Sequence, residues 1–166
     1  TLDGVAELLV KATPLVLIGV GLSLGFQANV WNIGAEGQLV IGALAGGGLA
    51  LAFYDQSSTF LVPAMLVFGV IGGMAWAAIP AWLKTRFNTN EILTSLMLTY
   101  VGLLVLSYLV HGPWKDPEGQ NFPESRLFHD SALLPILIDE TRLNVGWLLA
   151  LFVVVLGWIL MSRHII

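Results

Sequence analysis

Polar side chains interrupt apolar sequence at two places, 29–38 (NVWNIGAEGQ) and 88–99 (NTNEILTSLMLT). The groups that could line or gate a solute path are amides, hydroxyls and two carboxylates: Asn32, Glu36, Gln38, Asn90, Glu91, Thr94 and Thr99. Amides and hydroxyls can hydrogen-bond neutral hydroxylated solutes, whereas phosphate and carboxylate ligands are usually held by Arg or Lys. The predicted membrane spans contain no Arg or Lys, so these groups suit a neutral polyhydroxyl solute.

The elements that must position these groups are apolar helices. The chain is 57% hydrophobic and 11% charged, with a mean hydropathy of +0.84. No charged residue occurs within five long stretches, namely 12–35, 37–54, 56–83, 92–114 and 143–162. A helix needs about 20 residues to cross the hydrocarbon core, and backbone groups in lipid must pair within their own segment. The sequence therefore predicts an all-α, polytopic transmembrane helix bundle with about five crossings.

The first polar stretch follows an apolar run that looks too short to span. From Pro14 to Phe26 there are 13 residues, which at about 1.5 Å each fall well short of the hydrocarbon thickness. We therefore expect a broken or re-entrant helix near residues 27–38, with glycines permitting the turn. An ionisable group at that depth is a functional candidate by default. The alternative is that Glu36 simply favours the positive end of the next helix.

The second polar stretch has a local explanation. Asn88 or Asn90 can cap the following helix, and Glu91 stands three residues after Asn88, as in a capping box. Thr94 and Thr99 can bond carbonyls of their own helix at little cost in lipid. Capping and a path role both remain open for this stretch. Glycines four residues apart predict close helix packing at three pairs: Gly21 with Gly25, Gly42 with Gly46, and Gly69 with Gly73.

Charge distribution sets the predicted orientation. Lys84 and Arg86 follow one apolar run, and Arg163 with His164 ends the last, which places both on the cytoplasmic side. Residues 112–144 carry six acidic residues against three basic ones, and four prolines. We expect this segment to be an external loop that docks a partner protein.

Both polar stretches carry a family resemblance. KATPLVLIGVGLSLGFQANVWNIGAEGQLVIGA, followed by LKTRFNTNEILTSLMLTYV, resembles permease subunits of bacterial ABC importers for simple sugars and nucleosides, a group that includes ribose and branched-chain amino acid permeases. Thr99 departs from the Asn expected in that motif. The resemblance implies a multi-pass protein of the bacterial inner membrane, paired with a second permease as a homo- or heterodimer. It also implies two cytoplasmic ATPase subunits that bind ATP and Mg²⁺, and an extracytoplasmic substrate-binding protein.

Rival functions make different demands on the sequence. An ion-gradient-driven secondary transporter would use Glu36 and Glu91 to bind a proton or sodium. An intramembrane enzyme would need a motif such as His-Glu-x-x-His or Gly-x-Ser-x-Gly, and neither occurs. There is no cysteine, the three histidines lack metal-ligand spacing, and no basic patch suggests nucleic acid. We expect a non-enzymatic permease domain over 1–166, within a longer chain, with no cofactor of its own.

Overall fold

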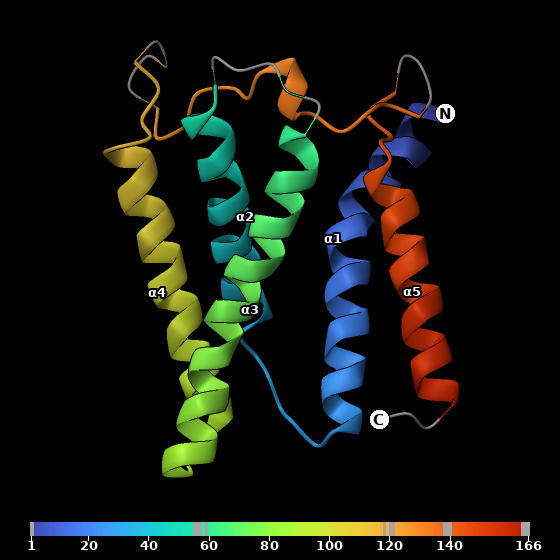
Figure 1. Cartoon of the computed structure of the whole chain (residues 1–166), viewed down its shortest axis with the longest axis vertical. Coiled ribbons are helices and arrows are strands. Elements are labelled where there is room, and N and C mark those ends of the chain that lie inside the picture. The colour runs from blue at the N-terminus through green and yellow to red at the C-terminus, as the bar shows by residue number, and fades with distance from the viewer. Residues whose placement is uncertain are drawn as a thin grey trace. The chain divides into compact units, whose positions relative to one another are not determined.

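The computed structural model is helical. It describes residues 2–54, 58, 60–117, 119, 122–137 and 141–163. The elements are α1 (Leu2–Gln27), α2 (Ala35–Ala52), α3 (Leu61–Phe87), α4 (Glu91–His111), a 3-10 turn η1 (Asp130–Ala132) and α5 (Gly146–Ser162) (Figure 1). Within the described part of the chain, extended pairing is limited to two isolated bridges, Lys115 with Ser125 and Ile136 with Asn144.

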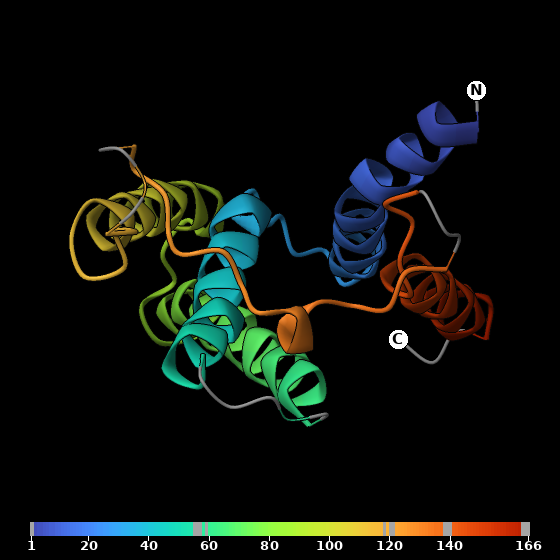
Figure 2. The same ribbon diagram turned by 90° about the horizontal axis from the view of Figure 1, so that it is seen from above.

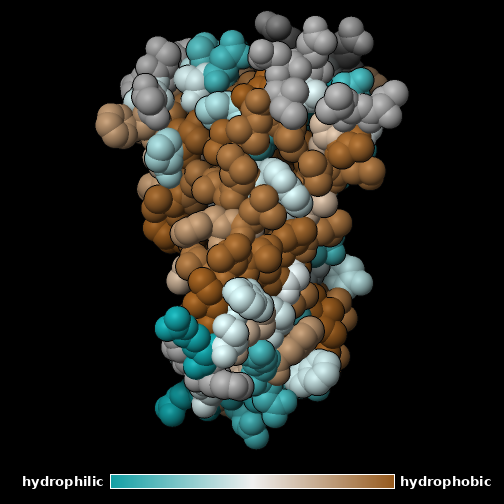
Figure 3. Space-filling view, turned by 90° about the vertical axis from the view of Figure 1, so that its right-hand side faces the viewer, coloured by the Kyte–Doolittle hydropathy of each residue, from teal (hydrophilic) through white to brown (hydrophobic). Residues whose placement is uncertain are grey.

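Four of these helices are long and apolar enough to cross a membrane: Asp3–Gln27, Ala35–Ala52, Leu61–Phe87 and Glu91–His111. The fifth, α5, is a shorter apolar helix of 17 residues. On the face seen in Figure 3, hydrophobic side chains fill a broad middle zone and hydrophilic ones gather toward the two ends. The predicted all-α membrane fold is confirmed.

The chain divides into two compact units, Thr1–Trp31 with Leu134–Ile166, and Asn32–Leu133. In the first unit, α1 and α5 pack together and run in the same direction (Figure 1). They meet where a Cβ placed on Gly157 would lie 2.6 Å from Cγ1 of Val20. The predicted packing role of Gly21 is not seen in this unit, because a Cβ there would meet nothing within 4 Å.

The length of α1 corrects one expectation. Its 26 residues begin well before Pro14, which lies inside the helix. The N-terminal part of α1 is bent relative to the rest of the helix (Figure 2), and an interior proline is a known cause of such bends. A proline interior to a helix is tolerated in a membrane because neighbouring groups can satisfy the freed carbonyl. The first apolar helix is therefore long enough to cross the membrane, and the expectation that it is too short was wrong. The helical break itself is present, but it is confined to Ala28–Gly34.

The end of α1 is built from its own backbone. Asn29 adopts a left-handed conformation with φ of 59°. Its N–H donates to Phe26 O at 3.0 Å, and the N–H of Val30 donates to Gly25 O at 2.9 Å. This is the Schellman pattern that closes a helix, and Asn tolerates its left-handed residue well. The role of Asn29 is thus to end the helix.

In the second unit, α2 packs against both α3 and α4. Against α3 the backbones approach through glycines: a Cβ on Gly42 would lie 2.8 Å from Gly69 O, and one on Gly46 would lie 2.8 Å from Met65 O. The predicted small-residue contact is confirmed for these two helices. At one end of the unit, Ala50, Leu61 and Ala132 form a small buried cluster that joins α2, α3 and η1.

Candidate functional site

The first polar stretch leads into α2 through a side-chain turn. Oδ1 of Asn32 accepts the N–H of Gly34 at 2.8 Å, an Asx-type turn that sets the entry into the helix. The N–H of Ile33 donates to Oγ of Ser95 on α4 at 3.2 Å. Asn32 is half-buried, and its amide oxygen already has a partner. The structure therefore assigns Asn32 a turn-forming role, and contact with a solute stays a prediction.

Close backbone contact joins the start of α2 to α4. A Cβ on Gly34 would lie 2.9 Å from both Cβ and O of Ser95, and one on Gly37 would lie 2.8 Å from Cα of Thr99. Gly102 continues the contact, because a Cβ placed on it would lie 3.5 Å from Cα of Gly37. Only residues without a side chain permit this approach, because the atoms they face are mostly backbone. The two polar stretches, more than fifty residues apart in sequence, thus form one junction.

The hydroxyls at this junction are buried. Ser95 is 2% exposed and Thr99 is 5% exposed. Oγ of Ser95 donates to Ile92 O at 3.1 Å, and Oγ1 of Thr99 donates to Ser95 O at 3.1 Å. This back-bonding within the helix was expected. A solute could reach Thr99 only if α2 and α4 separated, so its path role remains a prediction.

Glu36 lies on a different side of α2 from the junction. Gly37 is buried against α4, while the neighbouring Glu36 is exposed. Glu36 takes no part in the ion pair of Lys11 with Glu7 or in that of Lys84 with Glu91. Gln38, two residues further on, is half-buried. Of the carboxylates singled out by the sequence, Glu36 is the one that the structure leaves accessible at a helix N-terminus.

The second polar stretch caps α4. Oδ1 of Asn90 accepts the N–H groups of Ile92 at 3.0 Å and Leu93 at 3.4 Å, and Oγ1 of Thr94 donates to Asn90 O at 2.8 Å. The capping role predicted for Asn90 is confirmed. The capping box from Asn88 was wrong, because Asn88 ends α3 in a left-handed conformation with φ of 51°.

Glu91 has a partner outside that helix. Its Oε2 lies 2.8 Å from Nζ of Lys84, the basic residue near the end of α3. The pair spans the short connection between α3 and α4 and supports the turn between them. A carboxylate already paired with Lys84 is less suited to bind a transported cation than a free one.

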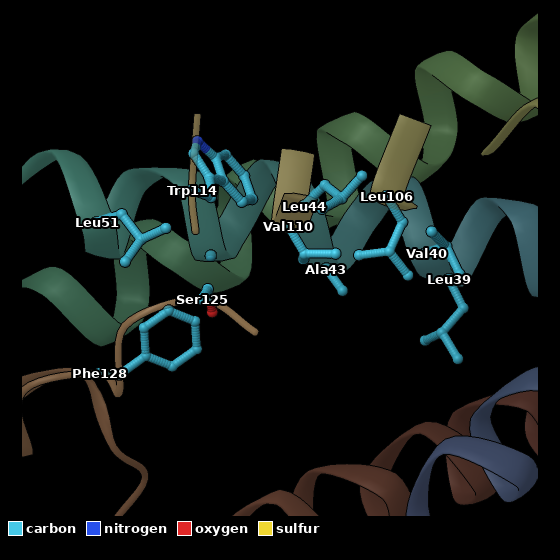
Figure 4. A pocket seen from close by; sticks show the side chains of 11 residues that line it. Leu39, Val40, Ala43, Leu44, Leu51, Leu106, Val110, Trp114, Ser125 and Phe128 are labelled. Atoms are coloured by element: carbon cyan, nitrogen blue, oxygen red, sulfur yellow. The ribbon is translucent and has the colours of Figure 1, made fainter. Parts of the chain in front are cut away.

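The loop after α4 lies on α2. Rings of Trp114 and Phe128 cover Gly48 and Gly47, at 3.0 Å and 3.2 Å from the positions of the missing Cβ atoms. Both rings also line a groove of about 340 Å³ between α2 and α4 (Figure 4). Among its lining residues, Ser125 brings the single hydroxyl and the rest of the wall is nearly all apolar. Such a wall does not suit a polyhydroxyl solute, so the groove is not the candidate path.

One polar face escaped the sequence reasoning. On the side of α4 turned away from α2, Tyr100 and Tyr108 are 62% and 70% exposed. His111 follows on the same side, with Nδ1 2.8 Å from Ser107 O. The signal in the sequence was the spacing of 100, 104, 108 and 111, a helical period that places these side chains on one face. Among the residues that the structure describes, no group of His, Asp or Glu could hold a metal ion.

The architecture, apolar helices joined through glycines with a few polar groups at their junctions, defines a multi-pass membrane protein. Residues 4–164 match the family described as the branched-chain amino acid transport system / permease component, and the chain belongs to this family.

Several proteins similar to this chain are named as ABC transporter permeases. The chain is 39% identical over 170 residues to the glucose ABC transporter permease protein TsgB13 of Haloferax volcanii, covering 96% of this chain and 44% of that protein. It is 30% identical over 164 residues to the guanosine ABC transporter permease protein NupP of Bacillus subtilis, covering 96% and 46%. The nucleoside ABC transporter permease protein NupB of Lactococcus lactis is 24% identical, with coverage of 96% and 46%. The chain thus spans less than half the length of these relatives. No solved structure matches it.

Proposed function

We propose that this chain is part of the permease subunit of an ABC importer, and that it helps to form the path of a neutral polyhydroxyl solute, a nucleoside or a simple sugar. The observation that carries the proposal is the family match over 4–164, together with relatives named for glucose, guanosine and nucleoside transport. The subunit itself catalyses no reaction. It lowers the barrier to crossing by alternating between inward-open and outward-open arrangements.

The chemistry of the spans supports a neutral solute. In α1 the charged side chains are confined to the first turns, before Pro14, and Lys84 and Arg86 lie at the end of α3. Beyond these helix ends the described helices contain no Arg or Lys, and hydroxyls lie within α1 and α4. A path without cations has no clamp for phosphate or for a carboxylate. A hydroxylated solute, by contrast, can exchange its water partners for hydroxyls and amides.

The partners in this proposal supply energy and direction. Two cytoplasmic ATPase subunits bind ATP and Mg²⁺, a second permease subunit completes the path as a homo- or heterodimer, and an extracytoplasmic binding protein delivers the solute. The bacterial inner membrane is the expected location. The segment 112–144 is the proposed docking surface for the binding protein. Its Trp114 and Phe128 rest directly on glycines of α2, so contact with the loop could act on that helix.

The test is uptake into proteoliposomes by the protein at its natural full length, with its ATPase and binding protein. Radiolabelled guanosine and glucose serve as probes. We expect accumulation of at least one of them that requires ATP and Mg²⁺ and is lost when the ATPase is left out. Uptake that persists without the ATPase and collapses when an ionophore removes the ion gradient would instead support a secondary transporter that uses Glu36.

A further inference from the structure

The face of α4 opposite α2 differs in chemistry from the exposed faces of α3 and α5. Ser95, Thr99 and Gly102 are buried against α2. About half a turn away around the helix, four large side chains stand at spacings of three or four residues and are 62% to 70% exposed: Met97, Tyr100, Leu104 and Tyr108. Ser107 and His111, both exposed, extend this set toward the end of the helix. We call these six residues the α4 outer face.

Two other helices of the same chain provide the comparison. The exposed large side chains in the middle of α3 are Leu66, Val67, Phe68, Val70, Ile71 and Met74. Those of α5 are Leu148, Leu149, Leu151, Phe152, Val155, Leu156, Trp158 and Ile159. Apart from the indole N–H of Trp158 near the end of α5, neither set contains a hydrogen-bonding group. Such faces suit contact with lipid, whereas the α4 outer face carries phenols, a hydroxyl and an imidazole.

The depth of Tyr100 makes the difference significant. It is the tenth of the 21 residues of α4, so it lies about 13 Å from one helix end and about 17 Å from the other at 1.5 Å per residue. Membrane tyrosines normally lie at the water interface, where the hydroxyl is hydrated. A phenol near the middle of a span loses that hydration, and an unpaired hydroxyl in hydrocarbon is costly. No hydrogen bond of Tyr100 occurs within the described residues.

The polar groups of the face continue from the middle of the span to its end. Nδ1 of His111 donates to Ser107 O at 2.8 Å in the neutral form, which leaves Nε2 as an acceptor. Tyr100, Tyr108 and His111 thus present a hydroxyl, a second hydroxyl and a ring nitrogen along one line of the helix. The two phenol rings also offer flat apolar surfaces. A solute with hydroxyls and an apolar ring face could contact both kinds of surface.

We propose that the α4 outer face lines a water-filled solute path, and that Tyr100 stacks against the ring of a passing neutral solute while its hydroxyl hydrogen-bonds a solute hydroxyl. This inference rests on the proposed transport function and identifies residues that would line the solute path. The shared chemistry is a neutral ring with hydroxyl substituents, which describes both a nucleoside and a simple sugar. A planar nucleobase stacks on an aromatic ring more strongly than a saturated sugar does, so the two sources can be separated.

Water access to the face is tested without any transport. In a cysteine-free version of the full-length protein, single substitutions Met97→Cys and Leu104→Cys are compared with Val70→Cys on α3 and Phe152→Cys on α5, which are 61% exposed each. All four are reacted in proteoliposomes with a membrane-impermeant thiol reagent. We expect the two α4 positions to react at least about tenfold faster than the controls. Equal, slow reaction at all four positions would mean that lipid or another helix covers the face, and would overturn the inference.

Solute contact is tested by a graded series at Tyr100. Tyr100→Leu removes the ring and hydroxyl, Tyr100→Phe removes the hydroxyl alone, and Val70→Leu is the control on a lipid-type face. At matched expression, we expect Tyr100→Leu to raise the KM for guanosine about three- to tenfold, Tyr100→Phe to raise it less, and glucose uptake to respond mainly to loss of the hydroxyl. Normal KM values in both Tyr100 variants would refute the contact. If the unsubstituted protein shows no ATP-dependent uptake of either probe, the proposed function fails, while the thiol reactivity still reports whether the face is wet.

Discussion

The contact between α2 and α4 gives a sharp test at Gly37. Substitution Gly37→Ala would place a Cβ 2.8 Å from Cα and 3.2 Å from N of Thr99. Both atoms are backbone, so no side-chain rotation can relieve the overlap and one helix must move. Movement would also lengthen the hydrogen bond from Ile33 N to Ser95 Oγ, now 3.2 Å. Overpacking costs about 1 to 3 kcal/mol, and a weakened hydrogen bond adds up to about 1 kcal/mol.

Part of that cost is offset, because alanine is favoured over glycine in a helix by about 1 kcal/mol. We therefore expect Gly37→Ala to lower the free energy of unfolding by up to about 3 kcal/mol. Gly21→Ala is the matched control, since a Cβ on Gly21 meets nothing within 4 Å, and it should be neutral or stabilising by up to about 1 kcal/mol. The assay is equilibrium unfolding by SDS titration in mixed micelles, followed by circular dichroism. If both substitutions change the free energy of unfolding equally, the argument from backbone contact is refuted.

Three further outcomes follow from other contacts. Gly157→Ala places a Cβ 2.6 Å from Cγ1 of Val20. In a double-mutant cycle, adding Val20→Ala should restore about 1 kcal/mol or more of the free energy of unfolding that Gly157→Ala removes, and strict additivity would contradict the contact. Asn90→Ala removes the acceptor for two N–H groups of α4 and should cost about 1 kcal/mol in the same unfolding assay, whereas no change would deny the cap its role. Reversing the charges of Asp116 and Glu118, the latter outside the described residues, should weaken the affinity for the binding protein measured by surface plasmon resonance, and the loss of affinity should be smaller at high salt. Unchanged affinity would contradict the docking role and leave the loop as a connector.

The helical fold was readable from the sequence because lipid leaves few alternatives. Charge-free stretches marked the crossings, and two of the three glycine pairs lie at a close helix contact, that of α2 with α3. The start of α1 was missed because Lys11 and Pro14 resemble a boundary. In the structure, Lys11 pairs with Glu7 one turn earlier at 3.1 Å, and the helix passes through the proline. An ion pair between residues four apart on one helix and a tolerated proline are local and environmental effects that a count of apolar residues does not register.

The candidate site was harder to predict, because side-chain type does not show direction. Asn32 and Thr99 stood out as polar residues beside apolar runs, yet their partners are local backbone groups. Such bonds satisfy a polar group within its own segment, which is how a membrane protein carries hydroxyls and amides without any solute contact. The sequence did not single out Tyr100 as a site residue, because an aromatic residue within an apolar run is typical of a buried core position. Only the position of α2 on the opposite side of the helix shows that Tyr100 faces outward.

The polar groups at the junction of α2 with α4 and those on the α4 outer face have separate roles. Ser95 accepts a hydrogen bond from the N–H of Ile33 and lies against Gly34, so it helps to set the angle and distance between α2 and α4. Trp114, resting on Gly48, ties the loop to the far half of α2. A displacement of the loop would therefore displace α2. Because α2 packs against α4, the position of α2 also affects the position of the α4 outer face. Because α2 and α4 are in direct backbone contact through glycines, we expect a displacement of α2 by the loop to displace α4 as well.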